Sequence, residues 1–219
     1  MDISDIETFL DSPNPQSRMK AITELRNHES AVVVPLLKRR MYDQQFLVRS
    51  FVAMGLGYKR NEEAFTTLLT MVERETDPNV IAEAANSISK FGPQSLPHLT
   101  KIFEEHPHWL VRQSIFAAFE DLYDPDVLLG LCRLGLEDQD ATVKLTALSN
   151  LSRLNETAKS HEALELLIQA TADSDGLIRA RAARLLKPLN DPRVKPVLDK
   201  LRQDSDYRVV RVFLEGLLQ

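Results

Sequence analysis

The stretch QQFLVRSFVAMGLG, residues 44–57, decides the fold, because versions of it recur along the chain. Each version starts with a turn residue and continues with a β-branched apolar residue, often followed by Arg or Lys. Small and apolar residues then recur at helical spacing. The other copies are DPNVIAEAANSISKFG, PHWLVRQSIFAAFE, DATVKLTALSNLSRL, DGLIRARAARLLKPL and DYRVVRVFLEGLL.

The copies repeat with a nearly constant period. Their β-branched anchors are Val48, Val80, Val111, Val143, Ile178 and Val209, separated by 32, 31, 32, 35 and 31 residues. An earlier copy, NPQSRMKAITELR, has Ser17 at the anchor position. A period in the range of about 20–50 residues is typical of a solenoid built from stacked units.

A second type of helical segment lies between these copies, as in AVVVPLLKRRMYD and SLPHLTKIFEEHP. Several of these segments have Pro near the start, which the first helical turn tolerates, and most end in Asp, which can cap the next helix. The sequence therefore predicts an all-α fold, an α-solenoid of about seven helix-hairpin repeats forming a single domain over residues 1–219. The second helix of each repeat is expected near residues 15–26, 46–57, 79–91, 109–121, 141–154, 176–187 and 207–218.

A proline-tolerant first helix, an Asp in the turn and Val-Arg opening an alanine-rich second helix resemble HEAT repeats. The short period resembles the HEAT-like subtype of phycobilin lyases and phycobilisome-degradation proteins. The resemblance extends from about Asp11 to Leu218. It implies a protein-binding solenoid and a connection with phycobiliproteins, but the lyases have no compact catalytic motif to match residue by residue.

Composition narrows the classes of protein further. The net charge of −5 over 219 residues argues against a general nucleic-acid binder, which presents a strongly basic surface. The single cysteine, Cys132, excludes an internal disulfide and fits a reducing compartment. There is no secretory signal at the start and no apolar run of about 18 residues, so we expect a cytoplasmic protein without a membrane span.

No motif indicates catalysis or metal binding. His106 and His108 are two residues apart in EEHPHWLVRQS, and zinc requires three or four ligands, so this stretch is predicted to be a helix junction. Gly55 and Gly57 follow a helix rather than a strand, which excludes a phosphate-binding loop and favours a C-terminal helix stop. Cys132 is predicted to be a buried core residue. We expect no metal and no catalytic residues.

Aligned charged residues are predicted to form a structural ladder of caps and hydrogen bonds between repeats. Its expected members are Asp43, Asp77, Asp140, Asp175 and Asp206 together with Arg49, Arg112, Lys144 and Arg179.

Two sets of residues are candidates for binding a partner. Residues 60–130 carry a net charge of −7 and residues 176–219 a net charge of +5, an asymmetry that can orient a partner. The candidate basic residues are Arg179, Arg181, Arg184, Lys187, Arg208 and Arg211; ordinary solvated faces are the alternative. Phe46 and Trp109 share one register, and they either pack under the neighbouring turn or form exposed hot spots.

The last segment, VVRVFLEGLLQ, has no polar capping helix after it. Terminal repeats of a solenoid need a polar outer face. Phe213, Leu217 and Leu218 are therefore predicted to leave an apolar end, which either a second copy of the chain, in a homodimer through the C-terminal helix, or another partner would cover.

Three functions remain open. The first is a non-catalytic scaffold or adaptor that binds another protein, such as a phycobiliprotein, and needs no cofactor. The second, implied by the resemblance, is a bilin-lyase enzyme or lyase subunit that attaches or detaches a phycobilin. The third is a DNA-repair glycosylase on a HEAT-like solenoid, which would need a basic groove that the acidic central repeats do not provide.

Overall fold

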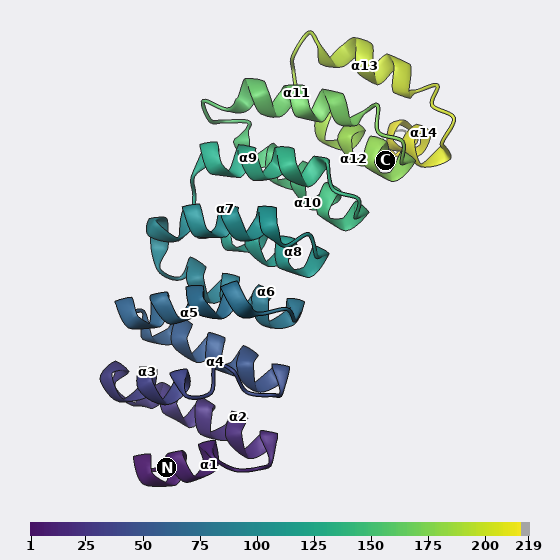
Figure 1. Cartoon of the computed structure of the whole chain (residues 1–219). Helices are drawn as coiled ribbons and strands as arrows, with labels where there is room; N and C mark the ends of the chain where they lie inside the picture. The colour runs from purple at the N-terminus through teal and green to yellow at the C-terminus, as the bar shows by residue number, and fades with distance from the viewer. Residues whose placement is uncertain (216–219) are drawn as a thin grey trace. The chain divides into compact units, whose positions relative to one another are not determined.

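The structure is a computed structural model that describes residues 1–215, and these residues form helices and no strand. The chain divides into two compact units, Met1–Leu122 and Tyr123–Gln219. Each unit is a stack of helix hairpins (Figure 1), which confirms the predicted all-α solenoid architecture. The single domain over residues 1–219 stays a prediction.

The first unit consists of four hairpins. Their helices are α1 (Ile3–Leu10), α2 (Pro15–Glu24), α3 (Ser30–Lys38), α4 (Phe46–Lys59), α5 (Glu62–Arg74), α6 (Pro78–Ser89), α7 (Leu96–Glu105) and α8 (Trp109–Ala118). Two short 3₁₀ turns, η1 (Leu25–Asn27) and η2 (Gly92–Ser95), join them. The second helices α2, α4, α6 and α8 contact one another in sequence, so they form one continuous layer.

The second unit has three hairpins within the described residues. Its helices are α9 (Pro125–Leu136), α10 (Ala141–Leu151), α11 (Ser160–Ala170), α12 (Gly176–Leu186), α13 (Val194–Leu201) and α14 (Tyr207–Leu214), with a 3₁₀ turn, η3 (Ser152–Leu154). Here α10, α12 and α14 form the layer of second helices. The predicted end of the last of these, at residue 218, lies outside the described residues.

The β-branched anchors form the core of each unit. Val48, Val80 and Val111 are fully buried in the first unit, and Val143 and Val209 in the second. One side of each second helix therefore packs between hairpins, which is how a stack buries an apolar stripe that a single hairpin would leave in water. Within the described residues, no helix is both long and apolar enough to cross a membrane.

The predicted helix stop at Gly55 and Gly57 is wrong, because α4 continues through both to Lys59. Gly57 serves packing instead. A Cβ atom there would lie 2.6 Å from Oγ of Ser87 and 3.0 Å from its Cα, so only glycine lets α4 and α6 approach this closely. The helix stops at Arg60, whose φ of 49° places it in the left-handed region.

The predicted apolar C-terminal end is wrong for Phe213. Its side chain is buried in a cluster with Val209, Val212 and Leu201, and the guanidinium of Arg202 lies 5.0 Å from the centroid of its ring. The helix packing that stacks α14 against α12 and α13 therefore already covers Phe213. Leu217 and Leu218 lie outside the described residues, so the homodimer stays a prediction.

Candidate functional site

The turns before α6, α10, α12 and α14 contain two acidic residues with different tasks. The second acid caps the helix: Asp77, Asp140, Asp175 and Asp206 each accept a hydrogen bond from a backbone N–H in the first turn. Such a cap satisfies a donor that has no partner within the helix. The predicted capping role is confirmed for these four aspartates, whereas Asp43, the fifth predicted member, does not cap α4, whose N-cap residue is Gln45.

The first acid, two residues earlier, links neighbouring repeats. In the first unit Arg18 of α2 donates from Nη2 to Oδ1 of Asp43 over 2.8 Å. Arg49 of α4 donates from Nε and Nη2 to the two carboxylate oxygens of Glu75, over 2.6 and 3.0 Å. Its Nη1 also donates to the carbonyl oxygen of Asp43 over 2.7 Å. One guanidinium therefore binds the turns on both sides of its own helix.

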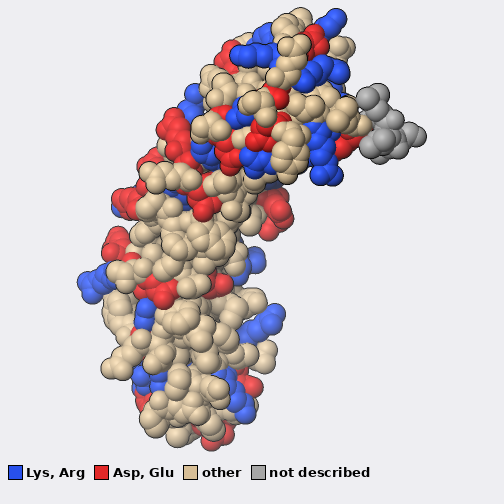
Figure 2. Space-filling view, turned by 90° about the vertical axis from the view of Figure 1, so that its right-hand side faces the viewer, with Lys and Arg blue, Asp and Glu red and all other residues tan. Residues whose placement is uncertain are grey.

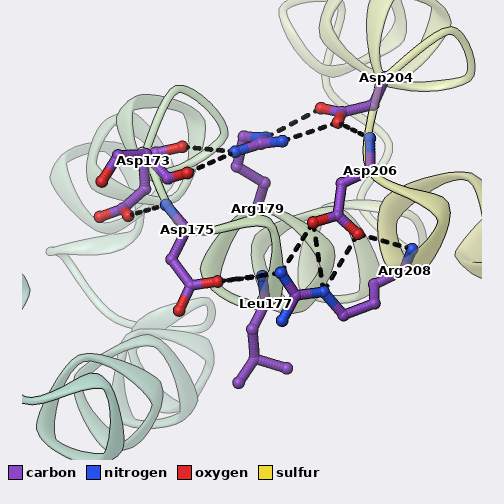
Figure 3. Close-up of polar contacts among 8 residues, drawn as sticks. Asp173, Asp175, Leu177, Arg179, Asp204, Asp206 and Arg208 are labelled. Atoms are coloured by element: carbon purple, nitrogen blue, oxygen red, sulfur yellow. Dashed lines mark hydrogen bonds and ion pairs between the residues drawn. The ribbon is translucent and has the colours of Figure 1, made fainter.

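The same ladder continues inside the second unit (Figure 3). Lys144 of α10 donates to Oδ2 of Asp173 over 2.7 Å. Arg179 of α12 binds both oxygens of Asp204 over 2.7 and 2.9 Å and donates to the carbonyl oxygen of Asp173 over 2.8 Å. Bidentate pairs of this kind are stronger than single hydrogen bonds and define one orientation.

The ladder lowers the pKa values of its carboxyl groups. Arg179 donates to Asp204 and holds the pKa of that carboxyl below its usual value. For Glu75, burial alone would raise the pKa, but hydrogen bonds from Arg49 and from backbone N–H groups outweigh it and the pKa is lowered. At Asp206 the hydrogen bonds from the side chain and backbone of Arg208 lower the pKa to about 2. These carboxylates therefore stay ionised and structural.

Sequence reasoning included Asp43, the acid partner of Arg18, but missed the acid partner in the other ion pairs of the ladder. It identified Arg49, Lys144 and Arg179 as members of the ladder but not their acid partners, which are Glu75, Asp173 and Asp204. A signal for them was available, since an acid occurs two residues before the cap in ETD (75–77), DSD (173–175) and DSD (204–206). The spacing alone does not show which helix supplies the base.

The candidate basic residues of α12 and α14 are largely occupied by partners in their own unit. Arg181 donates to Oγ of Ser149 over 2.9 Å, and Lys187 to the carbonyl oxygen of Val212 over 3.3 Å. Arg208 binds Asp206 and also reaches Asp175. With Arg179 bound to Asp204, these four cations stabilise the stack, and their binding of a partner stays a prediction.

Arg184 and Arg211 are brought together by Glu215. Arg184 approaches Oε1 of Glu215 at 2.9 Å and Arg211 at 3.3 Å. The side chain of Arg211 is 69% exposed, so this pair has the most accessible charge of the predicted basic set. Because Glu215 neutralises one of the two arginines, the three side chains together carry one net positive charge.

Large apolar side chains are exposed where α4 and α8 begin. Phe46 is 37% exposed, Leu47 48% and Trp109 45%. Both rings are therefore partly accessible to solvent, and the role of Phe46 and Trp109 as hot spots stays a prediction. The turns lie on the right in Figure 1 and face the viewer in Figure 2, where broad uncharged areas cover the first unit.

The junction before α8 lacks the two acids and uses histidine as its cap. Nδ1 of His108 accepts the backbone N–H of Leu110 at 3.2 Å, and its ring stacks on Trp109 with 6.0 Å between centroids. The described residues contain no group of three or more His, Cys, Asp or Glu side chains that could hold a metal ion. The stretch around His106 and His108 is therefore a helix junction.

The thiol of Cys132 does not offer a nucleophile. Burial in α9 raises its pKa to about 12, so the reactive thiolate is disfavoured. This burial confirms the predicted core position.

Comparisons with known proteins show which proteins share this architecture. A family model described as HEAT repeats matches residues 33–120 and 128–217. Escherichia coli YibA has a similar solved structure, with a TM-score of 0.62 and 17% identity over 97% of this chain and 80% of that one. The CpcE–CpcF complex of phycocyanin lyase from Nostoc sp. gives a TM-score of 0.54 and 21% identity, over 97% of this chain and 92% of the other. At these identities the likeness concerns the fold. No curated protein sequence matches the chain.

Proposed function

The chain belongs to the HEAT-repeat family, and we propose that it is a non-catalytic scaffold that binds another protein through the edge where α4 and α8 begin. The observation that carries this proposal is the exposure of Phe46, Leu47 and Trp109 in one unit. Exposed aromatic side chains supply much of the binding energy at protein interfaces, with Trp and Tyr especially enriched.

The distribution of charge supports a scaffold rather than an enzyme. Ladder residues such as Arg49, Glu75, Arg179 and Asp204 are engaged with one another, and their carboxyl pKa values are lowered rather than tuned towards neutral pH. A general acid or base works best with a pKa near the operating pH. The ladder makes the stack rigid and leaves the apolar edge free for a partner.

Site-specific photocrosslinking tests the proposal. Trp109 is replaced by p-benzoylphenylalanine in the full chain, and crosslinked proteins are identified in the native host. Val32 of α3, which is 41% exposed but lies on a first helix, provides the matched control position. We expect a defined partner to crosslink at position 109 and not at position 32. The same set of proteins at both positions, or none at position 109, would overturn the proposal.

A phycobiliprotein is the partner we propose within this function. Its support is the sequence resemblance together with the fold shared with the CpcE–CpcF complex of phycocyanin lyase. The alternative, a lyase-type enzyme or lyase subunit, would also bind the phycobilin itself. Size-exclusion chromatography with phycocyanin, monitored at the bilin absorption, distinguishes these cases. Co-elution with an unchanged absorption band supports the scaffold, and co-elution with a shifted or lost band supports the lyase. Separate elution overturns the phycobiliprotein as partner in both cases.

A further inference from the structure

An apolar cavity of about 230 Å³ opens between α2, α3 and α4 of the first unit. Pockets that bury drug-sized ligands measure about 300–1,000 Å³, so this one suits one or two side chains rather than a large cofactor. The apolar residues of its lining include Ile22, Leu25, Val33, Leu37, Phe51 and Met54.

Gly55 of α4 belongs to the lining of the cavity. Gly55 presents no side chain where α4 faces α2 and α3. A Cβ there would lie 3.0 Å from Cδ1 of Leu37 and 3.6 Å from Cγ2 of Ile22, so these two side chains close directly over bare backbone. The half-exposed Phe51 and Met54 form the side that opens to solvent.

Two cations flank an exposed tyrosine at the mouth of this cavity. Tyr58 is 46% exposed and lines the cavity. The guanidinium carbon of Arg26 lies 4.6 Å from the centroid of its ring, and Nζ of Lys90 lies 5.1 Å from it. Cations at this distance from a ring are held by its quadrupole. The tyrosine thus brings together positive charges from the end of α6 and from the turn after α2.

These two cations form no ion pair within the described residues. Glu83 attracts Lys90 through charge without forming a direct ion pair with it, and its Oε1 accepts a hydrogen bond from the hydroxyl of Ser87 at 3.4 Å. Lys59 also lines the cavity. It donates hydrogen bonds to the carbonyl oxygens of Arg26 and His28, over 2.9 and 2.6 Å, at the end of η1. Arg26 and Lys90 therefore remain available to a carboxylate from outside.

The cavity continues into an apolar stripe along α4. Leu47, Phe51, Met54 and Tyr58 follow at intervals of four, three and four residues, so they lie on one side of the helix. All four are exposed or half-exposed. At 1.5 Å per residue the stripe is about 16 Å long, which corresponds to several side chains of a bound segment.

We propose that the cavity and this stripe, here called the α4 groove, bind an acidic segment of a partner protein. The segment inserts an apolar side chain beside Met54 and places its carboxylates against Arg26 and Lys90. This inference rests on the proposed function as a protein-binding scaffold and concerns a surface that starts at Leu47, a residue shared with the edge, and runs along α4 to the cavity. Apolar anchors at helical spacing are how grooves of this kind hold amphipathic segments, and complementary charge selects among them.

The test uses the full chain and a random peptide library displayed on phage. We expect enriched peptides to carry Leu, Phe, Met or Trp next to several Asp or Glu. The best peptide is then synthesised with a fluorescent label, and its affinity is measured by anisotropy. The variant Arg26→Glu/Lys90→Glu should weaken binding by about tenfold or more, because it replaces attraction by repulsion.

A charge-matched control excludes a general effect of net charge. Lys38→Glu/Lys101→Glu makes the same change on first helices, where both lysines are more than half exposed. At physiological salt the Debye length is about 8 Å, so distant charges are screened and affinity should stay within about twofold. Circular dichroism confirms that both variants fold, and Tyr58→Ala provides a further variant that weakens binding without any change of charge.

Three results would overturn the inference: no enriched peptide, enriched peptides without an acidic excess, or equal weakening by the two double variants. Failure here is distinguishable from failure of the proposed function. Crosslinking at Trp109 without any peptide bound near Arg26 and Lys90 leaves the edge in place and removes only the α4 groove.

Discussion

Gly176 and Asp206 share one space in the second unit: a Cβ atom on Gly176 would meet the carboxylate of Asp206. Gly176 is the first residue of α12, while Asp206 caps α14 and binds Arg208. The missing side chain thus lets the carboxylate of one repeat sit against the helix start of the previous one. Both this contact and the ladder, which is drawn in Figure 3, depend on the same close stacking of turns.

Replacing Gly176 by Ala is therefore expected to destabilise the second unit. Elsewhere, Gly→Ala in a helix is stabilising by about 0.5–1 kcal/mol. A Cβ atom added to Gly130 of α9 would have no neighbouring atom within 4 Å, so Gly130→Ala provides the matched control. Urea denaturation should show a lower free energy of unfolding for Gly176→Ala and a higher one for Gly130→Ala. Stabilisation by both would contradict the close contact.

Breaking an ion pair of the ladder should lower the free energy of unfolding more than removing an exposed charge. Arg179→Met leaves Asp204 without its bidentate partner, and we expect a loss of about 1–3 kcal/mol because hydrogen bonds to charged groups are involved. Arg211→Met removes a 69% exposed side chain and should cost less than about 1 kcal/mol. Both values come from chemical denaturation, and equal losses would mean that the ladder does not stabilise the stack.

Acid should weaken the second unit through these carboxylates. The pKa values of Asp204 and Asp206 are lowered by hydrogen bonds from Arg179 and Arg208, that of Asp206 to about 2. A carboxyl with a depressed folded pKa stabilises the protein above its unfolded pKa, and this contribution is lost as pH falls through the folded pKa. We expect Tm to fall between about pH 4 and pH 2. Asp206→Asn keeps a capping side chain but should show a smaller decrease over that range.

The histidine cap of α8 can be improved. His108 accepts the N–H of Leu110 through a ring nitrogen, whereas the corresponding residue of four other repeats is Asp. His108→Asp should stabilise the first unit by about 0.5–1 kcal/mol, because a carboxylate also interacts favourably with the helix N-terminus. His108→Ala should be less stable than the wild type. Thermal unfolding of the three proteins in any other order would contradict the capping role.

Trp109 should contribute to partner binding without contributing much to stability. Because the side chain of Trp109 is 45% exposed, Trp109→Ala should change Tm little. It should lower the affinity for the partner identified by crosslinking by about tenfold or more. The exposed Val32 on α3 serves again as the comparison, with Val32→Ala leaving the affinity within about twofold. Equal affinity of the Trp109 variant and the wild type would remove Trp109 from the interface.

Much of the architecture could be predicted because its signals are local. Helical spacing marks where the second helices begin, capping aspartates mark the start of four of them, and the buried anchors Val48 and Val111 follow from the same alignment. The continuation of α4 through Gly55 and Gly57 could not be predicted in this way. In the sequence, these glycines resemble the end of a helix. In the structure, they allow Leu37 and Ser87 of neighbouring helices to approach α4 closely.

The sequence by itself determined the period, the helical class and the position of the turns, since each depends on residues within a few positions of one another. Tertiary structure alone decided which charges remain free. Arg179 looks like a binding residue until Asp204, 25 positions away, is found across the stack, while Arg26 and Lys90 have no visible connection until both meet at Tyr58. The physical reason is that ion pairs and grooves join atoms that are adjacent only after the hairpins have stacked, so the spacing along the chain does not contain them.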